Sequence, residues 1–238
     1  MSSQQPLLEI IDLHVSFDSK PVLSGFSAFL RPGEKIAVTG ESGSGKSTLL
    51  KCILGFIRPS SGIIRIAGEE LSLKNVWELR QDVGYVPQEP DLGKGTVESA
   101  LYRPFQYKAN KNLIPDRDEI HHLFNRFRLE KELMKKDIST LSGGEKQRIA
   151  IITAIFLKRD IYLFDEATSA LDDITREAVV DYFKDRTEFS ILAVTHDQLP
   201  LAPAYGDEGV NGLDSGLQGF SHRETVHDFR GRRFDRSG

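Results

Sequence analysis

The chain has 238 residues, of which 39% are hydrophobic and 28% are charged, and its formal net charge is -4 at pH 7. This length and composition are typical of a globular protein with one sizeable α/β domain. The calculated pI near 5.9 gives no global electrostatic reason to bind nucleic acid, so no nucleic-acid partner is expected.

The cysteine content and the apolar runs bear on where the protein works. Cys52 is the single cysteine, so an intrachain disulfide is impossible and a reducing compartment is expected. The first residues lack the basic and apolar regions of a signal peptide. The longest apolar stretch, at 149–157, is far shorter than the roughly 20 residues that cross a bilayer. Any work at a membrane would therefore need a second chain that crosses it.

The first third of the chain predicts short strands around one helix. Alternating apolar residues over 7–17 indicate a strand, and 36–40 is a short apolar strand that ends at a glycine. Apolar residues recur at helical spacing over 47–56, and the runs at 63–68 and 83–88 are again typical of strands.

The charge content and the hydrophobic pattern change twice in the remaining chain. From about 89 to 158 it is more charged and mostly helical in pattern, for example over 118–136. The runs at 161–166 and 190–196 are continuously apolar, as in parallel strands that are buried on both faces. The amphipathic stretch 175–186 lies between these runs, which predicts a βαβ unit and the α/β fold class.

A phosphate-binding loop follows the strand predicted at 36–40. GESGSGKST fits the pattern G-x-x-x-x-G-K-[ST] between a strand and a helix, which is the context that the motif requires. Its glycines let backbone N–H groups converge on phosphate, and the helix N-terminus adds its dipole. Lys46 is expected to bridge the β- and γ-phosphates, and Ser47 to bind Mg²⁺. The loop comprises Gly40, Glu41, Ser42, Gly43, Ser44, Gly45, Lys46, Ser47 and Thr48.

Two carboxylates end the strand predicted at 161–166. Asp165 is the candidate that reaches the Mg²⁺ shell, because an acidic residue at the end of a buried strand takes this place in P-loop enzymes. Glu166 follows where the strand leaves the sheet, and it is the candidate that orients and polarises an attacking water. Two solvated carboxylates at a strand end are the alternative, which the phosphate loop disfavours.

A second glycine turn opens the helical stretch near residue 142. Ser142, Gly143 and Gly144 precede an apolar helix, so their N–H groups and the helix dipole favour an anion. A capped helix start explains the same residues, since serine is a good N-cap. The residues alone favour the capped helix.

LSGGEKQR at 141–148, together with the phosphate loop and LFDEATSALD, resembles the signature set of ATP-binding cassette (ABC) ATPases over about residues 7–200. The resemblance implies ATP and Mg²⁺ as ligands. It also implies a dimer, in which the signature turn of one subunit closes over the γ-phosphate held by the phosphate loop of the other. The two glycine turns would then serve two composite sites.

Four further residues match motifs of that family. Gln88, in YVPQ, resembles the Q-loop glutamine that contacts Mg²⁺ and senses the transmembrane partner. Phe17 takes the aromatic position that stacks on adenine. Asp172, in SALD, resembles the aspartate of the dimer interface, and His196, in VTHD, resembles the histidine that contacts the γ-phosphate.

The resemblance also implies the fold, the partners and the location. We expect a P-loop NTPase with a mixed β-sheet core, an N-terminal antiparallel β part and an inserted helical subdomain. The core is expected over 1–88 and 159–238, and the helical subdomain over 89–158. The glycine-rich stretch 204–220 is expected to weaken the C-terminal strands.

An ATPase subunit of this kind works as a homodimer or heterodimer on the cytoplasmic face of the membrane and energises a separate permease. TVESALYRPFQYK, after the Q-loop, and the spacing to the signature resemble the small ATPases of Fet-type iron exporters. The alternative is a soluble ABC ATPase of the iron–sulfur cluster assembly type, which has no permease.

Overall fold

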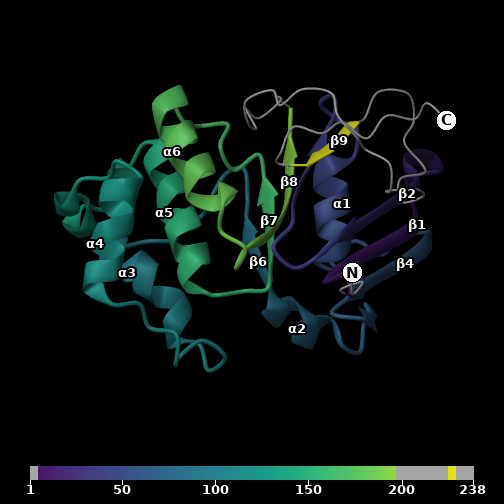
Figure 1. Cartoon of the computed structure of the whole chain (residues 1–238), viewed down its shortest axis with the longest axis horizontal. Helices are drawn as coiled ribbons and strands as arrows, with labels where there is room; N and C mark the ends of the chain where they lie inside the picture. The colour runs from purple at the N-terminus through teal and green to yellow at the C-terminus, as the bar shows by residue number, and fades with distance from the viewer. Residues whose placement is uncertain (1–4, 197–224, 229–238) are drawn as a thin grey trace.

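The computed structural model describes residues 5–196 and the backbone of 225–228 (Figure 1). An antiparallel sheet is built by the first strands of the chain, because the alternating apolar residues of the N-terminal strand bury one face. Its strand order is β2-β1-β4-β5. The bounds are β1 Leu8–Phe17, β2 Lys20–Leu30, β4 Ser61–Ile66 and β5 Glu69–Glu70.

A second sheet forms the centre of the molecule, with the order β6-β7-β8-β3-β9. Its first four strands run parallel, and β9 pairs antiparallel with β3. Every residue of β7 and β8 is buried, as their continuous apolar sequences predict. The bounds are β3 Lys35–Thr39, β6 Val83–Val86, β7 Ile161–Asp165, β8 Ser190–Thr195 and β9 Thr225–Asp228.

Helices cover both faces of the central sheet (Figure 1). The helix α1 lies between this sheet and the antiparallel sheet, and α5 and α6 lie on the other side. The helices are α1 Lys46–Ile53, α2 Val76–Leu79, α3 Val97–Tyr102, α4 Arg117–Arg126, α5 Gly143–Phe156 and α6 Asp173–Lys184. Short 3₁₀ segments lie at Arg80–Asp82, Arg103–Gln106, Lys131–Lys135 and Ile138–Thr140.

The helical pattern over 118–136 does not form one helix. The helix α4 ends at Arg126, and Arg128 then adopts a positive φ of 56°. The Leu129 N–H donates to the Phe124 carbonyl at 2.7 Å, and the Arg128 N–H donates to Asn125, which is the hydrogen-bond pattern of a Schellman turn. The turn buries Phe127 and Leu129, so the apolar spacing survives a break in the helix.

The α/β class, the mixed central sheet and the N-terminal antiparallel sheet are confirmed. The helices α3, α4 and α5 all lie between β6 and β7, whereas the boundaries of a helical subdomain at 89 and 158 stay a prediction. The stretch 204–220 lies outside the described residues. Among the helices of the described residues, none has both the length and the apolar character that crossing a membrane requires.

Candidate functional site

Three parallel strands bring the candidate residues to one edge of the central sheet. Thr39 at the end of β3 pairs in register with Thr195 of β8, and Asp165 at the end of β7 pairs with Val194. The phosphate loop, the two carboxylates and His196 therefore leave the sheet at the same edge. This carboxyl edge is where ligands bind in open α/β sheets.

The phosphate loop wraps around the amine of its own lysine. Lys46 is buried, and its Nζ donates to the carbonyls of Gly40 at 2.8 Å and of Glu41 at 2.9 Å. Gly45 has φ 101°, and a Cβ there would lie 2.9 Å from the Cγ1 of Val22, so no other residue fits without a shift. The loop therefore holds an ammonium group within a tight glycine turn.

A buried carboxylate lies next to the serine that follows this lysine. Asp165 accepts hydrogen bonds from the Ser47 hydroxyl at 3.0 Å and from the Tyr85 hydroxyl at 3.1 Å, one on each carboxylate oxygen. Burial, followed by the charge of Asp165 and this hydrogen bond, raises the pKa of Tyr85 well above its usual value. Tyr85 therefore remains a donor at neutral pH and fixes the carboxylate plane.

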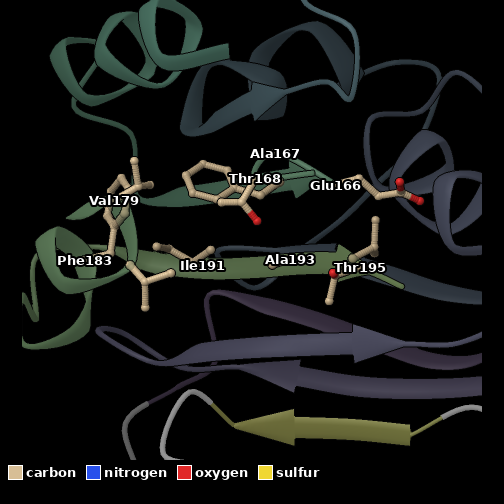
Figure 2. Close-up of a pocket in the computed structure, with 11 residues that line it drawn as sticks. Glu166, Ala167, Thr168, Val179, Phe183, Ile191, Ala193 and Thr195 are labelled. Atoms are coloured by element: carbon tan, nitrogen blue, oxygen red, sulfur yellow. The ribbon is translucent and has the colours of Figure 1, made fainter. Parts of the chain in front are cut away.

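Glu166 stands on a sharp turn directly after β7. Its φ is 47°, in the left-handed region, and its N–H donates to the Val194 carbonyl at 2.9 Å. One carboxylate oxygen accepts from the Gln88 amide at 2.7 Å, and the other lies 2.6 Å from the Nε2 of His196. An apolar pocket lies behind Glu166, between α6 and the strands β7 and β8, and the carboxylate points away from it (Figure 2).

His196 connects this carboxylate to the phosphate loop. Its Nδ1 lies 3.1 Å from the Gly40 carbonyl and 3.3 Å from the Nζ of Lys46. A continuous chain of polar contacts thus runs from Gln88 through Glu166 and His196 to Lys46. These four residues come from four separate segments of the sequence, and the structure brings all of them together.

The second glycine turn is a helix cap whose first N–H groups stay available to an anion. The Ser142 hydroxyl accepts from the N–H of Glu145 at 3.2 Å, and the Glu145 carboxylate accepts from the N–H of Ser142 at 2.8 Å, which is a capping box. Gly143 and Gly144 are the first residues of α5, so their N–H groups have no partner within the helix. Neither the cap nor the anion role therefore excludes the other.

The sequence matches the ABC transporter family over residues 23–169, which is more than half of the chain and includes the phosphate loop, the second glycine turn and both carboxylates. The chain belongs to the ABC transporter ATPases. As an ABC ATPase, it binds and hydrolyses ATP.

Individual relatives of this ABC ATPase agree with the family match. The energy-coupling factor transporter ATP-binding protein EcfA1 of Enterococcus faecalis is 36% identical, over 81% of this chain and 71% of the relative. The probable iron export ATP-binding protein FetA of Escherichia coli is also 36% identical, over 83% of this chain and 88% of the relative. The structure of cbiO1 from Clostridium perfringens, part of the ABC transporter complex cbiONQ, has a TM-score of 0.67 at 26% identity, over 82% of this chain and 80% of cbiO1.

The atoms of this ABC ATPase fit a nucleotide phosphate and a hard cation. The Ser44 hydroxyl in the phosphate loop is buried and lacks a hydrogen-bond partner within the described residues, as expected for a group that meets a phosphate oxygen. The Ser47 hydroxyl and the Asp165 carboxylate are oxygen donors of the kind that Mg²⁺ prefers. Within the described part of the chain no group of three or more His, Cys, Asp or Glu forms a metal cage. A cation at Ser47 and Asp165 would therefore share its shell with the nucleotide, as Mg²⁺ does.

The remaining predicted residues lie outside the chain of polar contacts. Phe17 ends β1 with 47% of its surface exposed, so its ring is accessible for stacking. Asp172 caps α6: its carboxylate accepts from the N–H of Thr175 at 3.0 Å and from the Thr175 hydroxyl at 2.8 Å, and these bonds hold the pKa of Asp172 below its usual value. Gly144 lies against the segment before Asp172, because a Cβ on Gly144 would approach the Ala170 carbonyl to 2.9 Å.

The motifs did not single out Tyr85 and Gln147. Tyr85 holds Asp165, and Gln147 of α5 donates from its amide to the Pro87 carbonyl at 3.1 Å. Tyr85 belongs to the YVPQ stretch, so its place directly before the Q-loop was the available signal. Gln147 belongs to the LSGGEKQR stretch at 141–148, so its place in that motif was the available signal.

Ser142→Ala is expected to lower the free energy of unfolding by about 1 kcal/mol, because the helix α5 loses its N-cap. Urea denaturation followed by circular dichroism measures this change. Ser60→Ala is the matched control, since Ser60 is exposed and lies outside the helices. An unchanged urea midpoint for Ser142→Ala would show that the capping box does not stabilise α5.

Proposed function

We propose that this ABC ATPase is the energising subunit of a membrane transporter, in which two ATPase subunits close head to tail on ATP and drive a separate permease. The observation that carries the proposal is the chain of contacts from Gln88 through Glu166 and His196 to Lys46. It supports the view that the groups needed for hydrolysis of a phosphoanhydride converge at one edge of the sheet. The family match supports transport as the process that hydrolysis drives.

The proposed chemistry assigns one task to each group. Glu166 accepts the proton of the attacking water, and Gln88 and His196 orient its two carboxylate oxygens. Lys46 and the N–H groups of the phosphate loop stabilise the charge that spreads over the phosphoryl oxygens. Ser47, Asp165 and Gln88 would hold Mg²⁺, which when bound neutralises the phosphate charge.

The dimer explains why one chain has two anion-binding turns. The phosphate loop cradles the nucleotide of its own subunit, and the first-turn N–H groups of Gly143 and Gly144 are directed to the γ-phosphate in the other subunit. Asp172 borders the same interface through the segment that touches Gly144. Phe17 stacks on adenine with its exposed ring.

We further propose a cytoplasmic location at the membrane face and iron as the exported substrate. The two relatives have equal identity, but this chain spans 88% of FetA and 71% of EcfA1. The match to most of FetA, which is named a probable iron export ATP-binding protein, supports iron export over the energy-coupling type.

Copurification tests the transporter proposal. Glu166→Gln with Mg·ATP, extracted from membranes with detergent, is expected to retain a polytopic permease, because blocked hydrolysis keeps the dimer closed. The same permease, added back to the wild-type chain, should raise its ATPase rate. Recovery of soluble assembly factors alone, with no permease, would instead support a cytosolic ABC ATPase of the iron–sulfur cluster type.

Metal tolerance tests the substrate. A strain without the gene should grow less well than its parent in excess iron, and the wild-type gene should restore growth. Complementation with Glu166→Gln is the matched control, which should fail. Equal tolerance of iron in both strains would contradict iron export without contradicting transport.

A further inference from the structure

Gln147 is a buried polar residue to which the proposed chemistry assigns no task. It lies in the second turn of α5, is 1% exposed, and donates through its Nε2 to the Pro87 carbonyl at 3.1 Å. Its Oε1 is also buried and has no hydrogen-bond partner within the described residues. An unpaired buried acceptor is costly, so an amide with one paired and one unpaired end indicates more than a packing role.

The bond from Gln147 joins two parts of the site that are far apart in the sequence. Pro87 directly precedes Gln88, whose amide donates to Glu166 at 2.7 Å. Gln147 lies on the same helix as the second glycine turn, five residues after the Ser142 cap. Two hydrogen bonds and one peptide bond therefore separate Gln147 from the Glu166 carboxylate.

Side-chain hydrogen bonds join the first turns of α5 to each other and to the turn after α4. Arg148, the next residue, donates from its guanidinium to the Gly144 carbonyl of its own helix and to the carbonyls of Phe127 and Arg128 in the turn after α4. We therefore expect a displacement of the glycine turn to reach Gln147 rather than to be absorbed within the first turns of α5.

We propose that Gln147 is a positioning residue that links the two ATP sites of the dimer. When the glycine turn closes on the nucleotide of the second subunit, Gln147 moves Pro87 and Gln88 and thereby sets the position of Glu166 in its own chain. This inference rests on the proposed head-to-tail dimer. The unpaired Oε1 is the acceptor that can gain a donor in the closed arrangement.

The test uses Gln147→Met, which keeps the length of the side chain and removes both amide groups. We expect kcat to fall by about tenfold, the effect of one hydrogen bond on a barrier, with the ATP dissociation constant changed less than about twofold. Thr153→Val is the matched control on α5, because it loses a bond to the Ile149 carbonyl but makes none to the Q-loop. The control should keep kcat, and the two variants should melt at similar temperatures.

A double-mutant cycle separates positioning from general damage. If Gln147 acts through Gln88, adding Gln147→Met to Gln88→Ala should lower kcat no further. If the falls in kcat of the two single variants multiply in the double variant, the inference is overturned. A wild-type kcat for Gln147→Met alone would also overturn it.

Hydrogen–deuterium exchange gives a readout that does not depend on turnover. A non-hydrolysable ATP analogue with Mg²⁺ should change the exchange of residues 85–92 in the wild type and in Thr153→Val, but much less in Gln147→Met. An identical response in all three proteins would overturn the inference. A wild-type chain without ATPase activity would contradict the proposed function itself, so the two failures are distinguishable.

Discussion

Glu166→Gln is expected to lower kcat for ATP hydrolysis by roughly 10² to 10⁴, the usual contribution of a general base. The glutamine amide cannot take up the proton of the attacking water. It also has only one oxygen, so it cannot accept hydrogen bonds from both the Gln88 amide and the His196 Nε2 as the two carboxylate oxygens do. ATP binding should persist, because the phosphate loop is untouched.

Phosphate release and equilibrium binding of a fluorescent ATP analogue measure these two effects of Glu166→Gln. Glu177→Gln is the matched control, since Glu177 is exposed on α6 and should behave as wild type. Hydrolysis at the wild-type rate by Glu166→Gln would remove Glu166 from the role of base. The carboxylate of another residue would then have to act as the general base.

Lys46→Met is expected to weaken ATP binding by roughly 10- to 150-fold, since a hydrogen bond to a charged group contributes about 1.5–3 kcal/mol. Methionine has a similar length but no charge, so the carbonyls of Gly40 and Glu41 also lose the donor that they share. Isothermal titration calorimetry with ATP measures the loss.

Lys51→Met is the matched control for this prediction, because Lys51 is exposed in the last turn of the same helix. The control should bind ATP as the wild type does. A dissociation constant of Lys46→Met within twofold of the wild type would show that the phosphates do not contact this amine.

The parts of the site that the sequence predicts lie within short segments of the chain. The loop at 40–48 and the carboxylates at 165 and 166 each belong to one strand and the turn that follows it. Parallel strands that neighbour one another then place these turns together, as the register of Thr39 with Thr195 shows. The fold class follows from the same reasoning, since buried parallel strands have a recognisable apolar pattern.

The parts of the site that the sequence does not predict depend on contacts between segments that are far apart in the chain. The bond from Tyr85 to Asp165 depends on β6 lying beside β7, and the bond from Gln147 to Pro87 depends on where α5 packs. The break after Arg126 was hidden for another reason: its turn uses arginine at a positive φ, where glycine is the usual signal. The apolar spacing continues across that turn, so the sequence pattern predicts a longer helix than the one that forms.

The backbone at Glu166 has a consequence for how this protein can change over time. A left-handed conformation costs a residue with a side chain about 1–2 kcal/mol relative to the right-handed one, and glycine escapes most of that cost. The chain would therefore be more stable with a residue that could not do the chemistry. We therefore expect Glu166→Gly to gain stability while losing the proposed chemistry, which sets folding against turnover at this one residue.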